Sequence, residues 1–413
     1  MAWFSPQISA VSDRGRGFSR ILSDVLAVGS AARDVILQRV PRAAKSVALY
    51  DGFGADGRVL IQGRALREQP LPPASAEDSR WRNLVATLRR ADAFPLPYAV
   101  LRVHVGGSSQ EIVADDEGFF TSWMSAENPE RIDDEWVRVR AELVSNEDAD
   151  VASGAGRALM PMGTPELVVV SDIDDTVLQS KVTNLVLAAQ TIAFGNARTR
   201  LPFPGVAAFY RALRRGPTGT GRSPLFYVSS SPWNLYDVIK QFLEIQGIPA
   251  GPIMLRDLDI GLDTLSSRHH HAHKREMIRR VLATYPDSPA ILIGDSGQQD
   301  PEIYRDVVRE HSGRIKAVYI RNVTMNDERS RAIHVLADEI LQAGSSLVLA
   351  DDTLAAARHA AEHGFIAPDA LTAIHEDKKA DEGVTPEKKD APGARDADDT
   401  PTPTVVVEDR QIS

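Results

Sequence analysis

The spacing of apolar residues changes along the chain, and each spacing predicts a different kind of structure. Between residues 1 and 45, apolar positions such as Phe18, Ile21, Leu22 and Val25 recur at near-helical spacing. Residues 46–146 carry short apolar runs separated by Gly, Pro and Asp, which is typical of strands. From residue 164 onward, apolar runs alternate with amphipathic stretches. We therefore expect a helical arm, a β domain and an α/β domain, in that order.

The second region predicts a small antiparallel β-sandwich. Its apolar runs are short, and the last of them alternates cleanly between apolar and polar positions. A helical insertion is predicted near residues 78–92. Catalytic residue types do not gather in this region, so we expect a binding or scaffolding role. The predicted strands are 47–50, 59–63, 98–105, 111–113, 119–120 and 136–144.

The third region, residues 164–372, predicts a doubly wound, mainly parallel sheet with helices on both faces. Residues 147–163 contain Gly and acidic residues and are predicted to be a linker. Residues 376–413 hold 11 acidic and 6 basic side chains with few apolar ones, which predicts a disordered acidic tail. The expected strands are 167–171, 225–229, 290–294, 316–320 and 346–350. The expected helices are 205–214, 232–246, 274–284, 301–311, 329–342 and 353–363.

Charge and composition limit the classes of function. The formal net charge of −10 argues against a dedicated nucleic-acid binder, and the absence of cysteine excludes thiol catalysis. Neither a signal peptide nor a transmembrane run is expected, so we predict a cytoplasmic location. Residues 13–45 carry seven basic and three acidic side chains. A basic amphipathic arm of this kind either contacts an anionic membrane surface peripherally or packs on its own protein.

The first candidate site follows the apolar run Leu167–Val170. Three carboxylates, Asp172, Asp174 and Asp175, stand where this strand should end, together with Thr176. Open α/β sheets bind ligands at this end of their strands. Like charges so close together repel one another unless a cation offsets them. A carboxylate can attack phosphorus and a second can transfer protons, which makes Asp172 the candidate nucleophile and Asp174 the candidate acid/base. The alternative is an acidic surface turn.

The second candidate site is the run from Tyr227 to Trp233, in which apolar residues give way to serines before a predicted helix. Free backbone N–H groups at a helix start hold phosphate oxygens, and Ser229 and Ser230 would add hydroxyls. The alternative is an ordinary helix cap made by serine. Trp233 is a candidate substrate contact, with burial in the core as the alternative.

The third candidate site opens a predicted helix with four histidines and Lys274. Lys274 would neutralise a phosphoryl group and the aspartates around it. His273 is given at most a supporting role. Adjacent histidines rarely converge on one metal ion, so a solvated loop is at least as good an account of this cluster as a zinc site.

The fourth candidate site lies in the run Ile291–Glu302, a strand followed by an acidic loop and a helix that starts with proline. Asp295 would complete the oxygen ligands of a magnesium ion together with Asp172 and the backbone carbonyl of Asp174. Asp300 would lie behind it and orient Lys274 or a metal-bound water.

These four motifs, in this order on alternating strands, resemble those of the haloacid dehalogenase superfamily of magnesium-dependent phosphatases. More narrowly, the runs SDIDDTV, YVSSSPWNLY, HKREMIRRVL and LIGDSGQQDPEIY are similar to the actin-patch-associated phosphatidate phosphatase family and its bacterial relatives. The resemblance covers roughly residues 164–370. It implies Asp172 as nucleophile, Asp174 as acid/base, Ser229 and Lys274 as phosphate ligands and Asp295 as a Mg²⁺ ligand. Asp175 departs from the glycine that is common at this position in the superfamily.

The resemblance favours one function over two others. No large cap domain is expected between residues 181 and 204, which would leave the site open to a bulky substrate such as phosphatidate. The first hypothesis is therefore hydrolysis of phosphatidate to diacylglycerol. The second is hydrolysis of a soluble or protein phosphomonoester. The third is a non-catalytic phosphatidate-binding module, which the presence of Asp174 disfavours.

Overall fold

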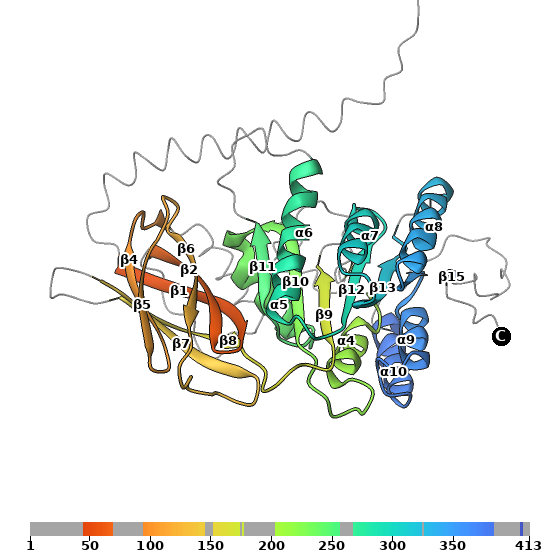
Figure 1. The fold of residues 1–413 in the computed structure, drawn as a ribbon, viewed down its shortest axis with the longest axis horizontal. Coiled ribbons are helices and arrows are strands. Elements are labelled where there is room, and N and C mark those ends of the chain that lie inside the picture. Colours follow the sequence, from red (N-terminus) through yellow and green to blue (C-terminus); the bar gives the residue numbers. More distant parts are fainter. Residues whose placement is uncertain are drawn as a thin grey trace, which may run out of the picture.

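The computed structural model describes residues 44–68, 94–144, 152–173, 176, 203–256, 267–323, 326–383 and 405–407. In these residues an eight-stranded mixed sheet lies beside a seven-stranded sheet that is covered by helices (Figure 1). The predicted arm, apart from its last two residues, and the predicted insertion at 78–92 lie outside them. None of the helices that the structure describes is long and apolar enough to cross a bilayer.

The N-terminal strands form one curled sheet, not the two facing sheets of the predicted sandwich. Hydrogen bonds connect all eight strands, and the β1–β8 pair is parallel while the other pairs are antiparallel. The register of β1 against β2 shifts between Tyr50 and Phe53. Such an irregularity bends a strand and helps the sheet to curl around a core on one face. The strands are β1 (Ala44–Ala55), β2 (Arg58–Glu68), β3 (Phe94–Pro95), β4 (Val100–Val105), β5 (Ser108–Val113), β6 (Phe119–Ser125), β7 (Trp136–Leu143) and β8 (Ser153–Leu159).

The segment that was predicted to be a linker contains β8, so this part of the prediction is wrong. Its glycines allow close packing between strands and do not mark a flexible connection. A Cβ atom on Gly154 would lie 2.2 Å from the backbone oxygen of Val47, and one on Gly156 would lie 2.6 Å from Cβ of Leu49. Glycine is required here because β8 passes so close to β1.

The α/β domain confirms the predicted parallel sheet. Its strand order is β11-β10-β9-β12-β13-β14-β15, and only β15 is antiparallel to its neighbour. The predicted strands and helices are present, most with small shifts at their ends, and β11, α10 and β15 are additional. The helix predicted at 274–284 begins seven residues earlier, at Ser267, so the histidine run lies in this helix and not in the predicted solvated loop. The elements are β9 (Val168–Asp172), α4 (Val206–Arg215), β10 (Leu225–Pro232), η1 (Trp233–Leu235), α5 (Tyr236–Ile245), β11 (Ile253–Arg256), α6 (Ser267–Thr284), β12 (Ala290–Asp295), α7 (Asp300–Glu310), β13 (Ile315–Arg321), α8 (Asp327–Gln342), β14 (Ser346–Ala350), α9 (Thr353–Glu362), α10 (Ala370–Gly383) and β15 (Val405–Val407).

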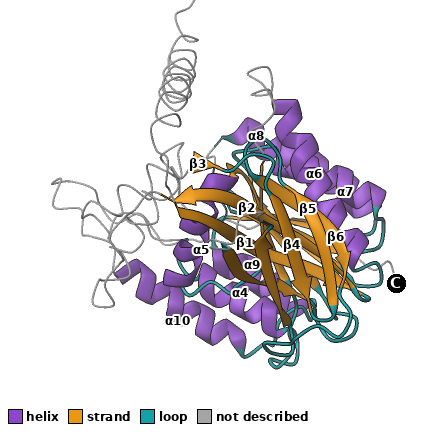
Figure 2. Ribbon diagram, turned by 90° about the vertical axis from the view of Figure 1, so that its left-hand side faces the viewer, coloured by secondary structure: helices purple, strands orange, loops and turns teal. Residues whose placement is uncertain are grey.

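Alternating strand residues bury against helices on opposite faces of this sheet. On β9, Val169 faces the core that includes α4, α5, α9 and α10, whereas Val168 and Val170 face the core that includes α6, α7 and α8. Figure 2 shows these two groups of helices on either side of the strands. Because β9 has β10 on one side and β12 on the other, the strand order reverses there. Such a reversal opens a crevice at the carboxyl ends of the strands.

The acidic tail begins later than predicted, because α10 continues to Gly383. Two of the residues assigned to the tail make structural contacts. The carboxylate of Asp381 accepts a hydrogen bond from the backbone N–H of Gly205 at 2.8 Å, and that of Asp377 accepts one from Ala208 at 3.1 Å. These N–H groups open α4, where a negative charge is favourable. Beyond residue 383, only β15 is described.

The two domains share a packed boundary. Phe53 of β1 is fully buried, and its ring meets that of Phe226 on β10 edge-on at 5.2 Å. Phe53 also contacts Trp123 of β6 at 5.9 Å. The apolar core that covers one face of the parallel sheet therefore extends into the β domain.

Replacing Phe53 with alanine is expected to lower the free energy of unfolding by about 3–5 kcal/mol, because the substitution leaves a cavity in this boundary. Denaturant unfolding at equilibrium measures the change. Val113→Ala, at a residue that is 63% exposed, is the control and is expected to change stability by less than about 0.5 kcal/mol. A loss below about 1 kcal/mol for Phe53→Ala would contradict the packed boundary.

Acid is expected to destabilise the fold through His359 on α9. Its ring lies 3.0 Å from the hydroxyl of Tyr319, and burial, with a smaller effect of His363, lowers its pKa from 6.5 to about 4. The unfolded chain therefore binds a proton at this position before the folded chain does. Stability falls as the pH decreases from 6.5 toward 4, by about 1.6 kcal/mol between pH 6.5 and 5. Unfolding curves at the two pH values measure the loss, and His359→Gln should remove most of it; an equal loss in that variant would contradict the assignment.

Candidate active site

Six polar side chains are buried at the carboxyl end of the parallel sheet, around the crevice beside β9. Each of them is at most 3% exposed. The backbone register places Asp172 beside Val228 of β10 and Ser171 beside Ile293 of β12, so the ends of the three strands converge. Polar groups so deeply buried need partners or a ligand. The six residues are Asp172, Thr176, Ser229, Lys274, Asp295 and Asp300.

Lys274 joins two of the carboxylates. Its Nζ lies 2.7 Å from Oδ1 of Asp172 and also pairs with Oδ1 of Asp300. Burial opposes the charged form of the lysine, but attraction to the two carboxylates is stronger in sum and raises its pKa. Lys274 is one helical turn before Ile278, which is buried against the sheet, so α6 directs the ammonium group toward the strand ends.

Asp295 carries a carboxylate oxygen that the described residues leave unsatisfied. Its Oδ1 accepts hydrogen bonds from the backbone N–H groups of Gly297 at 2.6 Å and Gln298 at 2.9 Å. Its Oδ2 is buried and has no hydrogen-bond partner among the described residues. Burial is the largest cause that raises the pKa of Asp295, the charge of Asp300 adds to it, and Lys274 partly offsets it.

The three carboxylates form a group that fits a divalent cation. Asp172, Asp295 and Asp300 each offer an oxygen within 4.8 Å of the others. Lys274 alone cannot neutralise three negative charges. Carboxylate oxygens are the ligands that Mg²⁺ prefers, usually one or two of them with water and phosphate oxygens. The donor set and the orphaned oxygen of Asp295 therefore suit Mg²⁺ better than zinc, which prefers nitrogen and sulfur ligands.

Glycine at position 294 allows Asp300 to reach the site. A Cβ atom on Gly294 would lie 2.4 Å from Oδ2 of Asp300. That oxygen accepts a hydrogen bond from the backbone N–H of Asp295 at 3.2 Å. Asp300 thus lies behind Asp295, as predicted, and connects Lys274 to the acidic loop that follows β12.

Two residues that hold the site were not predicted. Arg329 of α8 donates to the backbone oxygens of Ser296 at 2.8 Å and Gln298 at 2.6 Å, and it pairs with Glu302, so it braces the acidic loop. The hydroxyl of Tyr210 on α4 lies 2.6 Å from Oγ of Ser171, which donates to the backbone oxygen of Asp172 at 2.7 Å. Neither residue belongs to a recognisable motif. Arg329 looks like an exposed helix residue in the sequence, and Tyr210 looks like an ordinary core residue.

Of the remaining predicted residues, Thr176 and Ser229 are buried in the cluster, whereas Ser230 and Trp233 are more exposed. Thr176 donates to Oδ2 of Asp172 at 3.3 Å, and Oγ of Ser229 accepts a hydrogen bond from the backbone N–H of Ser231 at 3.0 Å. Ser230 and Trp233 are half-buried. The Trp233 ring stacks on Tyr50 of the β domain at 4.9 Å. A direct substrate contact by Trp233 stays a prediction.

Asp174 and Asp175 lie outside the described residues, so the predicted roles of Asp174 as acid/base and metal ligand stay predictions.

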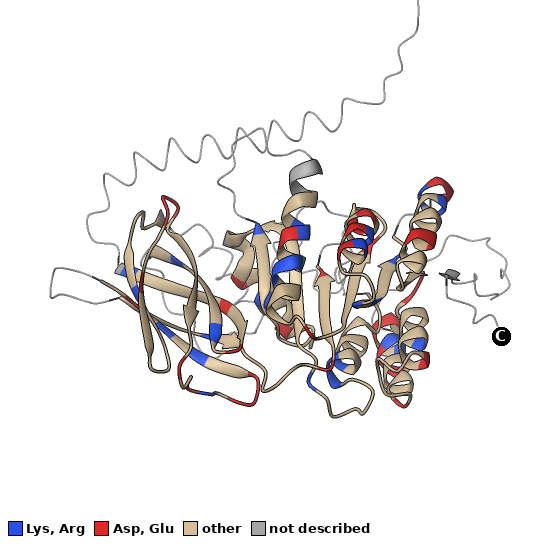
Figure 3. Ribbon diagram, in the orientation of Figure 1, with Lys and Arg blue, Asp and Glu red and all other residues tan. Residues whose placement is uncertain are grey.

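In the histidine cluster, Nε2 of His271 is 3.7 Å from the carboxylate of Asp306. His273 is half-buried and precedes Lys274 on α6. Acidic and basic residues alternate on α7 and α8, whereas blue predominates on α6 (Figure 3). On α6, Arg275 and Arg279 pair with Glu310, and Arg280 pairs with Glu276. Lys274 is in direct contact with two carboxylates of the site, and the positive charge of Arg329 interacts with Asp295 and Asp300 from farther away.

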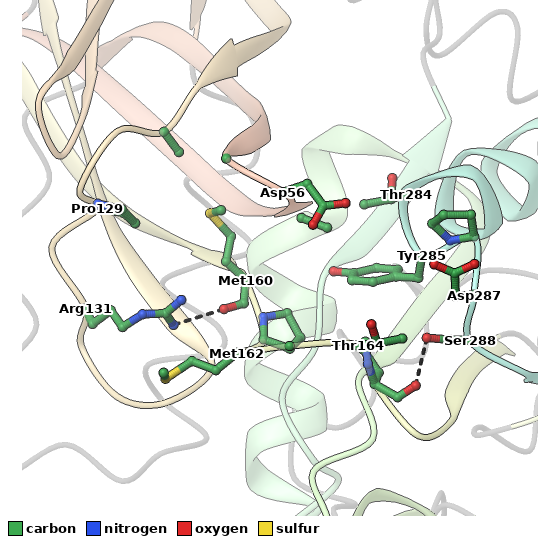
Figure 4. A pocket seen from close by; sticks show the side chains of 17 residues that line it. Asp56, Pro129, Arg131, Met160, Met162, Thr164, Thr284, Tyr285, Asp287 and Ser288 are labelled. Atoms are coloured by element: carbon green, nitrogen blue, oxygen red, sulfur yellow. Dashed lines mark hydrogen bonds between the residues drawn. The ribbon is translucent and has the colours of Figure 1, made fainter.

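Among the hollows on the described residues, two larger ones lie near the ends of the parallel sheet. One, of about 600 Å³, borders the acidic loop and is lined by His271, Gly297, Gln298, Gln299, Glu302 and Arg329. The other, of about 430 Å³, lies between the domains and includes Asp56, Arg131 and Tyr285 (Figure 4). It also contains residues that precede β9 and β12, so it opens at the opposite end of the parallel sheet from the carboxylates.

Comparison with known proteins links one segment of the chain to a family. Residues 167–322 match the family model of phosphatidate phosphatase APP1, catalytic domain. Phosphatidate phosphatase APP1 of Saccharomyces cerevisiae is 29% identical over 152 residues, which cover 37% of this chain and 25% of that protein. An uncharacterized protein of Schizosaccharomyces pombe is 28% identical over 159 residues, 38% of this chain and 25% of that protein. The match thus spans about a quarter of the length of each of these relatives.

Among solved structures, a β-glucuronidase of Parabacteroides merdae aligns with 71% of this chain and 39% of its own at 9% identity. Its TM-score of 0.25 is too low to support any argument. The family match, in contrast, covers Asp172, Lys274 and Asp295 and the strands that position them. Residues 167–322 are therefore similar to the catalytic domain of phosphatidate phosphatase APP1.

Proposed function

We propose that this protein is a magnesium-dependent phosphatase that forms an aspartyl-phosphate and converts phosphatidate to diacylglycerol. The observation that carries the proposal is the buried cluster of Asp172, Lys274 and Asp295 at the carboxyl ends of adjacent parallel strands. The relation of residues 167–322 to the APP1 catalytic domain supports phosphatidate as the substrate. The haloacid dehalogenase-like chemistry rests on the order of the four motifs.

In this proposal the carboxylate of Asp172 attacks the phosphorus atom, and the bond from phosphorus to the alcohol oxygen breaks. Asp174 donates a proton to that oxygen as diacylglycerol leaves. Asp174 then takes a proton from a water molecule, which attacks the phosphorus of the aspartyl-phosphate. This second displacement frees the carboxylate of Asp172 and releases inorganic phosphate.

Lys274 stabilises the charge of the phosphoryl group while Asp300 holds its ammonium in place. Ser229 and backbone N–H groups at the start of the helices after β10 would bind phosphate oxygens. Asp172 and Asp295, with the backbone carbonyl of Asp174, would hold Mg²⁺. When bound, the ion would neutralise negative charge on the carboxylates and the phosphate.

The proposal also specifies a substrate and a cellular location. The hollow beside the acidic loop leaves room for a substrate larger than a phosphate ion. We propose a cytoplasmic protein whose residues 1–45 contact anionic membranes peripherally.

A panel that compares phosphatidate in micelles with soluble and protein phosphomonoesters tests the choice of substrate. Equal turnover across the panel favours a soluble or protein substrate, and lipid binding without phosphate release favours the non-catalytic module.

Asp172→Asn is expected to reduce phosphate release from phosphatidate micelles by at least about a thousandfold, because an amide cannot serve as the nucleophile. The assay is run with Mg²⁺ on protein that shows a normal thermal transition. Asp287→Asn, which changes an exposed carboxylate at the opposite end of the sheet, is the control and should retain full activity. Substantial release by Asp172→Asn would exclude the covalent mechanism.

Asp295→Asn is expected to raise the Mg²⁺ concentration needed for half-maximal activity by at least roughly tenfold, because the variant loses a charged ligand. Chelation should abolish activity in the parent protein, and added Mg²⁺ should restore it. Asp351→Asn alters an exposed carboxylate that follows β14 at the same edge of the sheet, and it should leave the Mg²⁺ dependence unchanged. If Asp295→Asn has the parental Mg²⁺ dependence, Asp295 does not hold the ion.

A further inference from the structure

The segment that carries Ser229 is in direct contact with the β domain. Ser229 and Trp233 are separated by only three residues, Trp233 is the first residue of η1, and α5 follows directly after η1. The ring of Trp233 stacks on that of Tyr50 from β1, with centroids 4.9 Å apart and an interplanar angle of 11°. Tyr50 also meets Tyr236, the first residue of α5, at 4.3 Å. The loop that would hold phosphate is therefore attached to an aromatic side chain of the other domain.

Asp51, the next residue of β1, holds the first turns of α5. Its backbone N–H donates to the hydroxyl of Tyr236 at 2.7 Å. Its carboxylate, which is 3% exposed, lies 2.9 Å from Nζ of Lys240 and 3.1 Å from Nη2 of Arg157. Tyr236 and Lys240 are four residues apart and thus share one face of α5. A buried carboxylate between two cations fixes this face of the helix against β1.

The rest of the boundary between the domains makes contacts elsewhere. Phe53 packs on Phe226 in the middle of the sheet, and the hydroxyl of Tyr285 donates to the backbone oxygen of Gly54 at 3.2 Å. Glu135 pairs with Arg214 at the end of α4. These contacts can hold the domains together without touching the serine loop. The contacts of Tyr50 and Asp51 are different because they act on the loop and the helix that it enters.

We propose that Tyr50 and Asp51 position residues 229–233, where β10 ends and η1 begins and which we call the phosphate-binding loop, so that the β domain is a required part of the candidate active site. This inference rests on the proposed function for the role of Ser229, and it assigns the β domain a purpose. Both residues act through Trp233, Tyr236 and Lys240 and make no contact with the reacting atoms. Ser229 lies only a few residues before η1 and α5, so the position at which these helices pack constrains the end of β10, and the contacts therefore matter for Ser229.

The first test changes these contacts and follows the loop itself. Tyr50→Leu keeps an apolar side chain but loses the stacked ring, Lys240→Met removes one cation from Asp51, and Tyr50→Phe keeps the ring. Tyr285→Phe is the matched control, because it removes a hydrogen bond of the same boundary at the far end of the sheet. Hydrogen exchange of backbone amides in residues 229–236 is expected to become faster in Tyr50→Leu and Lys240→Met and to stay unchanged in Tyr50→Phe and Tyr285→Phe.

The second test uses the same four variants in kinetics with a soluble aryl phosphate and with phosphatidate micelles. In Tyr50→Leu and Lys240→Met, kcat/KM should fall by roughly tenfold or more, and the inhibition constant of inorganic phosphate should rise with it. The two control variants should stay within about twofold of the parent. A merely structural role would lower the melting temperature without changing phosphate inhibition in the folded protein.

The outcomes separate the inference from the proposed function. If the parent hydrolyses no phosphomonoester, the proposed function fails, and hydrogen exchange still decides whether β1 positions the loop. Unchanged exchange in Tyr50→Leu and Lys240→Met overturns the positioning role. Faster exchange with parental kinetics and phosphate inhibition also overturns it, because the loop would then move without consequence for the site. If Tyr50→Leu does not fold, Lys240→Met alone carries the test.

Discussion

The candidate site depends on one buried ammonium group. Lys274 comes from α6, Asp172 from β9 and Asp300 from the first turn of α7, so a single cation joins three elements at the carboxyl edge of the sheet. Placing these charges in the interior costs desolvation energy that their mutual attraction must offset. Such an arrangement persists only when the backbone holds each partner in place. The parallel sheet, with β9 between β10 and β12, provides that support.

The charges at this edge do not balance, and the imbalance has a chemical consequence. Three carboxylates gather around one lysine, and an oxygen of Asp295 has no hydrogen-bond partner among the described residues. A phosphate group would add further negative charge. A divalent cation together with Lys274 would offset both, which connects the electrostatics of the site to the proposed magnesium-dependent reaction. Arg329 contributes at a distance, because it holds the backbone of the loop that presents Asp295.

The α/β domain was predictable because its elements are locally consistent. The apolar strands are continuous, the amphipathic helices are separated by turns, and each predicted strand appears in the parallel sheet. The predictions were wrong where the local composition of a segment does not reflect its role in the tertiary structure. Gly154 and Gly156 predicted a linker, but they allow β8 to lie against β1. Asp377 and Asp381 contributed to a predicted disordered tail, but they bind the N-terminal N–H groups of α4. In the β domain, the strands were predicted but their arrangement in one curled sheet was not, since pairing between distant strands leaves little trace in a local pattern.

The sequence by itself determined which residue types stand at the ends of the parallel strands, and therefore the chemistry that the site can support. That inference is possible for three of the four motifs because parallel strands present their carboxyl ends at the same edge. The remaining motif was also predicted at a strand end, but Lys274 lies within α6 and reaches the same edge from that helix. Only the tertiary structure decided what holds those motifs in place. Tyr210, Arg329, Tyr50 and Asp51 reach the site or its loop from other elements. In the sequence they look like ordinary core or helix residues, because a side chain's partner across the fold is set by three-dimensional packing and not by its neighbours in the chain.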